Sequence, residues 1–281
     1  MTTFEYDDII CGFNGCEKLG EGGQKIVFSI EHREHGKCVL KVGRYESQYS
    51  LERIRREVEA LRDISSMYYP QQLGFQVVDD HRFYVLEERI DGNPLTTEMD
   101  RFASVEKATQ LVLRLVEGLK VIWERKIIHR DIKPGNIIVT PDGSPRIIDL
   151  GIARLTNLSS LTPSVWPSGP GTPIYASPEQ LENRKHEINH RSDQFALGII
   201  YAQLVLGGDH PFHPELVGHG ESIVENILNN RWAIDCFQSG DRTIILPVLS
   251  RMLAREPYGR YRQPEILADA LRGVLDEEGV A

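Results

Sequence analysis

Four polar residues of the chain have the side chains and the spacing for phosphate chemistry: Asp131, Lys133, Asn136 and Asp149. The carboxylate of Asp149 and the amide oxygen of Asn136 are hard ligands that suit Mg²⁺, which usually completes its octahedron with phosphate oxygens and water. Asp131 would then be available to accept a proton, and Lys133 to neutralise a phosphate. Each residue alone is typical of a turn or a solvated surface, whereas all four in this order are hard to obtain by chance.

These residues stand between short β-branched runs. Ile127–Ile128, Ile137–Val139 and Ile147–Ile148 are predicted to be short buried strands, so the polar residues fall on the loops between them. Pro141-Asp142-Gly143 is a good turn sequence, and it would fold the last two strands back on each other as an antiparallel pair. We therefore expect the two candidate metal ligands to come together beside a rigidly held loop.

The motif H-R-D-I-K-P-G-N at residues 129–136 resembles the catalytic loop of eukaryotic-type (Hanks-type) serine/threonine protein kinases, and D-L-G at 149–151 resembles their magnesium-binding D-F-G. The resemblance implies that Asp131 orients the acceptor hydroxyl and accepts its proton, while Lys133 balances phosphate charge. The two candidate metal ligands keep that role, and His129 is implied to be structural. ATP and Mg²⁺ are the implied cofactors.

Composition limits the partners and the compartment. The chain has 281 residues, an apolar fraction of 41% and a net charge of −9, which allows a large core and argues against broad binding to nucleic acid or an anionic membrane. Its four cysteines lack the spacing of a zinc site and are expected to be reduced thiols. No run is long enough to span a membrane, and the N-terminus is acidic where a signal peptide would be basic. We therefore expect a soluble cytoplasmic protein.

A glycine-rich turn between two predicted strands lies in the segment EKLGEGGQKIVFSI. Glycines let backbone N–H groups approach a phosphate closely, although a plain glycine hairpin explains this segment equally well by itself. Gly20, Gly22 and Val27 match the kinase pattern G-x-G-x-x-G-x-V. Gly23 is an additional glycine, and Lys25 occupies the position of the third. The resemblance assigns the three glycines and the valine to the nucleotide site.

A lysine inside an apolar strand follows at Lys41, in Cys38–Val42. Taken alone it is typical of an exposed strand edge, but it resembles the kinase lysine that contacts the α- and β-phosphates, with Val39 at the position of the alanine beside adenine. Glu57 is the corresponding glutamate of the next helix, so we expect a Lys41–Glu57 ion pair that forms when the helix swings in. Ser50 is the candidate N-cap. The helix is predicted from apolar residues three and four apart: Leu51, Ile54, Val58, Leu61 and Ile64.

The segment EERIDG resembles the hinge between the two kinase lobes. The resemblance assigns Ile90 to the main adenine contact and also places Glu88 and Ile138 at the nucleotide. Glu87 falls at the position that guards the back of the adenine pocket, and a buried glutamate there would need a partner. A shift of one residue would put Leu86 there instead, and the sequence leaves both alternatives open.

The C-terminal part is predicted to be mainly helical. An amphipathic helix over residues 105–122 leads into the catalytic loop. Asp193 resembles the aspartate that supports the backbone of that loop, and Arg260 resembles the arginine that pairs with the glutamate of the A-P-E motif, here Glu179. These positions support the fold and take no part in the reaction, so their presence is additional support for the resemblance. The resemblance covers roughly residues 17–270.

A Ser/Thr-rich stretch at 152–170 lies before G-T-P-I-Y-A-S-P-E at 171–179, which resembles G-T-x-x-Y-x-A-P-E with Ser177 in place of alanine. The resemblance makes this stretch the activation loop, and Arg130 could receive a phosphate on it. A solvated loop that is never phosphorylated is the alternative. The candidate phosphorylation sites are Thr156, Ser159, Ser160, Thr162, Ser164 and Ser168.

The sequence thus predicts an α+β, two-lobed protein kinase-like fold, with an N-lobe at 1–90 and a C-lobe at 91–281. The implied activity is ATP- and magnesium-dependent phosphorylation of serine and threonine in protein substrates, including its own activation loop. A soluble bacterial member with an activating partner protein, and with no nucleic-acid or membrane partner, is expected. The alternatives are a pseudokinase or nucleotide-binding scaffold, and a small-molecule kinase of related fold.

Overall fold

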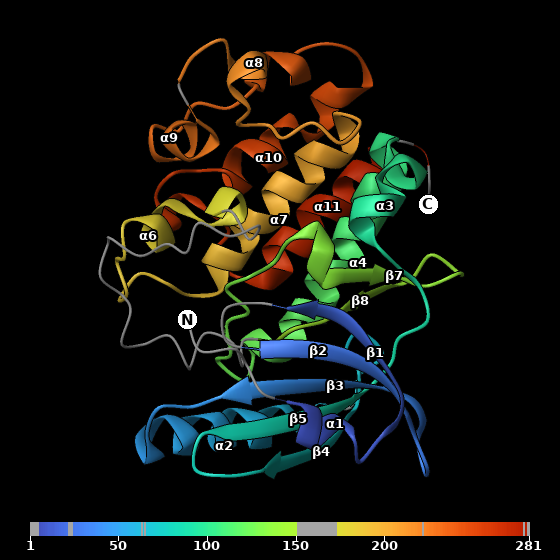
Figure 1. Cartoon of the computed structure of the whole chain (residues 1–281). Coiled ribbons are helices and arrows are strands. Elements are labelled where there is room, and N and C mark those ends of the chain that lie inside the picture. The colour runs from blue at the N-terminus through green and yellow to red at the C-terminus, as the bar shows by residue number, and fades with distance from the viewer. Residues whose placement is uncertain are drawn as a thin grey trace. The chain divides into compact units, whose positions relative to one another are not determined.

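The computed structural model describes residues 6–21, 25–62, 64, 66–150, 173–220, 222–277 and 279, with the backbone alone at 53, 57, 60 and 61. These residues divide into two compact units, one up to Asp91 and one from Gly92 onward, and Figure 1 labels most of the helices and strands of each. Within these ranges, no helix combines the length and the apolar character that crossing a membrane requires.

The N-terminal unit is built on a five-stranded antiparallel sheet in the order β1-β2-β3-β5-β4. Its strands are β1 (Asn14–Glu21), β2 (Lys25–His32), β3 (Gly36–Arg44), β4 (Gln72–Val77) and β5 (Arg82–Glu88). The register pairs Val27 with Lys41 and Lys41 with Val85 across the three central strands. Since side chains alternate between the two faces of a strand, these three lie on one face.

Two helices cover the two faces of this sheet. The short helix α1 (Asp7–Ile10) packs its Ile9 on one face, against alternate residues of the central strands: Ile26, Phe28, Ile30, Cys38, Leu40, Val42 and Leu86. The longer helix α2 (Gln48–Arg62) covers the other face with Leu51, Ile54, Val58 and the nearby Tyr45, against Phe83 and Val85. The period-two alternation of these strands is what produces the two separate cores.

An arginine fork fastens α1 to the β4–β5 hairpin. The guanidinium of Arg82 donates to both carboxylate oxygens of Asp8 at 2.7 Å, and its Nε donates to Asp79 Oδ2 at 2.7 Å. Asp79 in turn accepts from the backbone of the hairpin turn at His81 and Arg82. Bidentate pairing of this kind fixes orientation as well as position.

The N-cap predicted for α2 is wrong by one turn. The helix begins at Gln48, and Ser47 is the capping residue. Its hydroxyl accepts from the backbone N–H of Ser50 at 3.2 Å, while the hydroxyl of Ser50 accepts from the backbone N–H of Ser47 at 3.0 Å. This reciprocal arrangement satisfies two donors at the helix start, so Ser50 lies inside the first turn.

The second unit is mainly helical, and the predicted α+β organisation is confirmed. The helix α7 is its centre: every residue from Ser192 to Val205 is buried, as expected of a helix surrounded by others. The helices α4 and α10 pack on α7, and α11 packs on α4 (Figure 1). The bounds are α3 (Leu95–Glu98), α4 (Val105–Trp123), α6 (Pro178–Leu181), α7 (His190–Val205), α8 (Pro214–Val217), α9 (Ile223–Leu228), α10 (Leu246–Met252) and α11 (Pro264–Glu277).

A small three-stranded sheet in the order β6-β7-β8 lies beside these helices. It is formed by β6 (Asn93–Pro94), β7 (Ile137–Val139) and β8 (Pro145–Ile147). The predicted hairpin is confirmed, with Ile137 opposite Ile147, and Gly143 in its turn has a φ of 85°. At Gly92, just before β6, an added Cβ would lie 2.3 Å from the carbonyl oxygen of Val139, so a larger residue does not fit.

The strand predicted at Ile127–Ile128 does not form, because the C-terminal end of α4 uses this segment. Lys126 adopts a left-handed conformation with a φ of 60°, and the N–H of Ile127 donates to the carbonyl of Ile122 at 3.0 Å. Counted from Ile122 as the first residue, Ile127 is the sixth, and a bond of this 6→1 type is typical of the C-terminal end of a helix. The two isoleucines therefore follow the helix cap and lead directly into the H-R-D motif.

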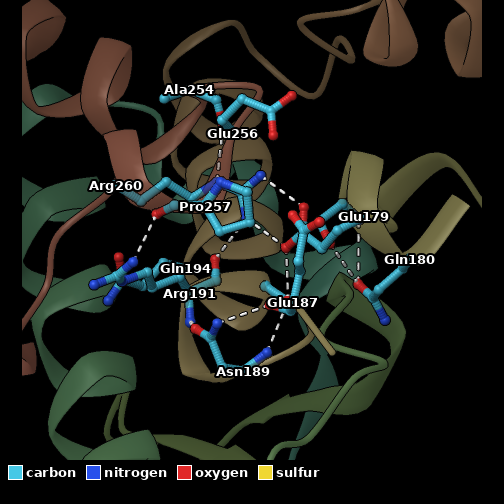
Figure 2. Close-up of polar contacts among 12 residues, drawn as sticks. Glu179, Gln180, Glu187, Asn189, Arg191, Gln194, Ala254, Glu256, Pro257 and Arg260 are labelled. Atoms are coloured by element: carbon cyan, nitrogen blue, oxygen red, sulfur yellow. Dashed lines mark hydrogen bonds and ion pairs between the residues drawn. The ribbon is translucent and has the colours of Figure 1, made fainter. Parts of the chain in front are cut away.

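A fully buried ion pair links α6 to the segment before α11. Arg260 donates to both oxygens of Glu179, at 2.7 and 2.9 Å, and neither side chain is exposed (Figure 2). Ser192 adds a bond to Glu179 Oε1 at 2.6 Å. The remaining N–H groups of Arg260 donate to backbone carbonyls, including that of Ala254 at 2.8 Å (Figure 2). Burial alone would raise the pKa of Glu179, but Arg260 and Ser192 outweigh it and lower that pKa.

Removing one partner of this pair would leave the other charge buried without compensation. Arg260→Ala is therefore expected to lower the free energy of unfolding by about 3–5 kcal/mol. The matched control is Arg272→Ala, which removes an arginine paired at the surface with Asp269 and should cost less than about 1 kcal/mol. Urea denaturation followed by circular dichroism measures both, and equal unfolding midpoints for the two variants would contradict the assignment.

Candidate active site

The backbone of the H-R-D segment is held by one buried carboxylate. Asp193, in the first turn of α7, is 1% exposed. Its Oδ1 accepts from the N–H of Arg130 at 2.8 Å, and its Oδ2 accepts from the N–H of His129 at 3.0 Å. Trp123, the last residue of α4, donates its indole N–H to Oδ2 at 2.8 Å. The predicted support of the catalytic loop by Asp193 is confirmed, and the contribution of Trp123 was not foreseen.

Arg130 adopts a left-handed backbone conformation, with a φ of 65°. A non-glycine residue in this region is strained by roughly 1–2 kcal/mol and persists only where its surroundings hold it. Asp193 binds the N–H of Arg130, and the side-chain amide of Gln180 donates to its carbonyl at 3.0 Å. Both peptide groups that flank the strained residue are therefore fixed from outside the loop.

His129 is fully buried and connects this loop to Ile148, the residue directly after β8. Its Nδ1 accepts from the N–H of Asp131 at 3.3 Å, so the proton lies on Nε2, which donates to the carbonyl of Ile148 at 3.1 Å. Burial lowers the pKa of His129, which keeps the imidazole neutral. With both nitrogens engaged in backbone bonds, His129 positions the loop, as the sequence implied.

The side chain of Asp131 is oriented by two neighbours on the same loop. Lys133 donates from Nζ at 2.9 Å and Asn136 donates from Nδ2 at 2.9 Å, and both reach Oδ2. Asn136 also donates to the backbone carbonyl of Asp131 at 2.8 Å. The structure thus brings together Asp131, Lys133 and Asn136, three of the four residues singled out first in the sequence. The two hydrogen bonds to Oδ2 fix the orientation of the Asp131 carboxylate.

The hairpin places Asp149 one residue away from a backbone contact with Asn136. The N–H of Ile148 donates to the carbonyl of Asn136 at 2.9 Å, so Asp149 is one residue from that contact. Asp149 has a φ of 64°, a second left-handed residue at the site. Since Nδ2 of Asn136 is directed at Asp131, its Oδ1 is the atom that can serve as a ligand. A carboxylate and an amide oxygen are a donor set that fits Mg²⁺.

In the N-terminal unit, three of the side chains predicted for the nucleotide share one face of the sheet. Val27, Val39 and Lys41 lie on that face, and Gly20 pairs with Val27 from β1. The same register puts Glu87 opposite Val39, whereas Leu86 points to the other face and is buried under α1. Glu87, and not Leu86, is therefore on the side of Lys41.

Lys41 forms an ion pair with this glutamate. Its Nζ lies 2.5 Å from Glu87 Oε2, and the two side chains are 10% and 13% exposed. The expected partner, Glu57, lies on α2, but its side chain is outside the part of the structure that is described. The Lys41–Glu57 pair therefore stays a prediction, while the Lys41–Glu87 pair is an observed contact that sequence reasoning missed.

Three more residues predicted for the nucleotide site lie in or beside strands. Glu88 is the last residue of β5, and its N–H donates to the carbonyl of Gln71 at 2.8 Å. Ile90 follows outside any strand, and Ile138 lies half-buried in the middle of β7. The following residues fall outside the described ranges: Gly22, Gly23, Thr156, Ser159, Ser160, Thr162, Ser164 and Ser168.

The segment around Tyr175 is anchored by contacts that the sequence did not signal. His210 donates from Nε2 to the carbonyl of Ile174 at 3.1 Å, and its Nδ1 accepts from the N–H of Phe212 at 3.2 Å. The hydroxyl of Tyr175 donates to Gln203 at 2.9 Å. These bonds fix the backbone immediately before the A-S-P-E motif, where an activation loop would end.

Comparison with known proteins agrees with this geometry. Residues 13–270 match the protein kinase domain. The chain belongs to the protein kinase family. This kinase domain is 31% identical over 69% of its length to the serine/threonine-protein kinase drp72 of Corynebacterium efficiens. It is 30% identical to PknA and 31% identical to the probable serine/threonine-protein kinase PknB of Corynebacterium glutamicum, again over 69%.

The predicted family and fold, a serine/threonine protein kinase resembling bacterial Hanks-type members, are therefore confirmed. The kinase domain covers only 38%, 42% and 32% of the lengths of drp72, PknA and PknB, respectively. The similarity therefore concerns the kinase domains of these relatives and not the rest of their chains.

The buried histidine beside Ile174 predicts a pH dependence of stability. Burial lowers the pKa of His210 to about 4, below its ordinary value of about 6.5. Between pH 4 and pH 6.5, His210 therefore binds more protons in the unfolded chain than in the folded chain. Its effect on the free energy of unfolding is absent above pH 6.5, and it destabilises the folded protein increasingly as the pH drops toward 4. Over this window the native protein should lose about 3 kcal/mol more than His210→Gln.

Urea denaturation at several pH values measures this difference, because the other titrating groups are common to both proteins. His186→Gln serves as the control, because it replaces a histidine that is exposed at the surface. Its curve should parallel that of the native protein. Parallel curves for His210→Gln and the native protein would show that His210 is not buried in its neutral form.

Proposed function

We propose that this kinase domain transfers the γ-phosphate of ATP to serine and threonine hydroxyls of protein substrates, with Mg²⁺ required. One observation carries the proposal above the others: the carboxylate of Asp131 is oriented by Lys133 and Asn136 on a loop whose backbone is fixed by Asp193. Phosphoryl transfer depends on positioning and charge stabilisation more than on covalent catalysis. A carboxylate held in this way suits that task.

Asp131 is the candidate base. Lys133 and Asn136 orient its carboxylate, which would in turn orient the incoming hydroxyl and accept its proton. Lys133 would turn from Oδ2 toward the transferred phosphate, where its positive charge opposes the charge that develops on the phosphate oxygens. His129 takes no part in proton transfer, because backbone groups occupy both of its nitrogens.

Asn136 and Asp149 are the candidate ligands for Mg²⁺, which when bound would neutralise phosphate charge. Two features of the chain support this role. The amide of Asn136 is oriented by Asp131, and Asp149 is held in a strained conformation next to an anchored peptide. Strain in a non-glycine residue at such a place is typical of a functional position.

The nucleotide side of the proposal rests on the N-terminal unit. Lys41 would contact the α- and β-phosphates, and Val27 and Val39 would pack on the adenine from the same sheet face. Gly20, Gly22 and Gly23 would cover the phosphates, and Glu57 would be a second partner of Lys41. Glu88, Ile90 and Ile138 would line the adenine site.

The substrate class follows from the loop and from the relatives. Lys133 two residues after Asp131 favours serine and threonine over tyrosine, and drp72, PknA and PknB are named serine/threonine kinases. We further propose that the domain modifies its own loop between Thr156 and Ser168, that a partner protein activates it, and that it acts in the cytoplasm.

Asp131→Asn tests the proposal directly, because the amide keeps the size of the side chain but cannot accept a proton. Incubation with Mg²⁺, γ-labelled ATP and a generic protein acceptor should show transfer reduced by roughly 10²–10⁴-fold, the usual contribution of a general base. Mass spectrometry should place the phosphate of the native protein on serine or threonine, including residues of its own loop.

Asp276→Asn provides the matched control, since Asp276 is an exposed aspartate near the end of α11. It should transfer phosphate at the native rate. Undiminished transfer by Asp131→Asn would exclude Asp131 as the base. Transfer to metabolites but to no protein acceptor would identify a small-molecule kinase instead.

A further inference from the structure

Glu87 is a charged residue on the sheet face proposed for the nucleotide, and the proposed transfer reaction assigns it no role. The carboxylate contacts Lys41 Nζ at 2.5 Å. It belongs to β5 and Lys41 belongs to β3, 46 residues apart, so the contact is set by the pairing of the two strands. Both residues lie in the same compact unit.

The strand register shows toward which end of the sheet the ammonium is held. Val85 is the residue directly opposite Lys41, whereas Glu87 lies two residues further along β5, opposite Val39. The glycine-rich turn that would cover the phosphates joins β1 and β2 at the other end, where Lys25 pairs with Gly43. The contact with Glu87 therefore holds the ammonium away from the turn, toward the Asp91 end of the sheet.

The contact is also shielded from water. The side chains of Lys41 and Glu87 are 10% and 13% exposed, in contrast to surface pairs such as Arg272–Asp269, at 51% and 73%. A shielded, charge-assisted bond is stronger than an exposed one, and an uncompensated carboxylate in such a place is unfavourable. Exchanging the carboxylate for a phosphate therefore costs free energy.

We propose that Glu87 competes with the nucleotide phosphates for Lys41, and that it thereby sets the affinity of the domain for ATP. This inference rests on the proposed function, since it requires Lys41 to be the phosphate ligand. Nucleotide binding exchanges one anionic partner of the ammonium for another. The carboxylate left behind also repels the incoming phosphates, so both effects oppose binding.

Glu87→Gln isolates this effect. Glutamine keeps the size of the side chain and an oxygen that can accept from Lys41, but it removes the negative charge. We expect ATP with Mg²⁺ to bind about tenfold tighter, the low end of what one hydrogen bond to a charged group contributes. Adenosine should bind with unchanged affinity, because it has no phosphate to engage Lys41.

Isothermal titration of the native protein and the variant with ATP·Mg²⁺, ADP·Mg²⁺ and adenosine measures these affinities. Glu31→Gln is the matched control, because Glu31 is an exposed glutamate on β2 of the same sheet. It removes the same charge without touching Lys41 and should leave all three affinities unchanged. Equal urea midpoints for the three proteins would show that the fold is retained.

The outcomes separate the inference from the proposed function. Tighter binding of ATP and ADP, with adenosine unchanged, supports the competition. Unchanged or weaker ATP binding by Glu87→Gln overturns it, as does an equal gain for adenosine, which would place the effect at the adenine. If neither the native protein nor Glu87→Gln binds ATP, the proposed function itself fails, and the competition fails with it.

Discussion

The buried carboxylate of Asp193 is the constraint on which the candidate active site depends. A carboxylate in the interior is stable only when hydrogen bonds replace water, and this one accepts from Trp123, His129 and Arg130. The bonds join α4, α7 and the catalytic loop at one point. They also hold Arg130 in a conformation that it would otherwise avoid.

Two partly or fully buried ion pairs have different consequences in the two units. Glu179–Arg260 is fully buried, with a third bond to the carboxylate from Ser192 and backbone carbonyls that accept from the guanidinium. No partner can enter, so the pair supports the fold. In Lys41–Glu87, the ammonium contacts one carboxylate oxygen on the sheet face proposed for the nucleotide. An ammonium can exchange partners more readily than a bidentate guanidinium, because it is a point charge without fixed geometry.

Buried histidines in the second unit act as neutral connectors. His129 and His210 each accept a backbone N–H at Nδ1 and direct Nε2 to a backbone carbonyl, at Ile148 and Ile174. Burial lowers the pKa of both, which removes the charge that would abolish the acceptor nitrogen. His129 joins the catalytic loop to the segment between β8 and Asp149, and His210 fixes the segment before A-S-P-E.

Much of this molecule could be predicted from the sequence, because the signals are local. The hairpin at Pro141–Gly143 and the amphipathic helix α4 depend on residue types a few positions apart, and both formed as expected. The H-R-D-x-K-x-x-N motif is equally local, and the family that it indicated is confirmed. The roles of Asp193 and Arg260 were predicted from their positions in motifs. The structure shows the expected contacts, of Asp193 with the backbone of Arg130 and of Arg260 with Glu179. The apolar pair Ile127–Ile128 misled, because a strand and a helix cap with apolar residues have the same short pattern.

Only the tertiary structure decided which charged groups meet. Three contacts each join residues 46 or more positions apart: that of Lys41 with Glu87, that of the Trp123 indole with Asp193 and that of the Gln180 amide with the carbonyl of Arg130. Strand register and helix packing set these contacts, and neither is encoded in the identity of the residues concerned. The sequence by itself therefore determined the family and the set of chemical groups, while packing determined how those groups are paired.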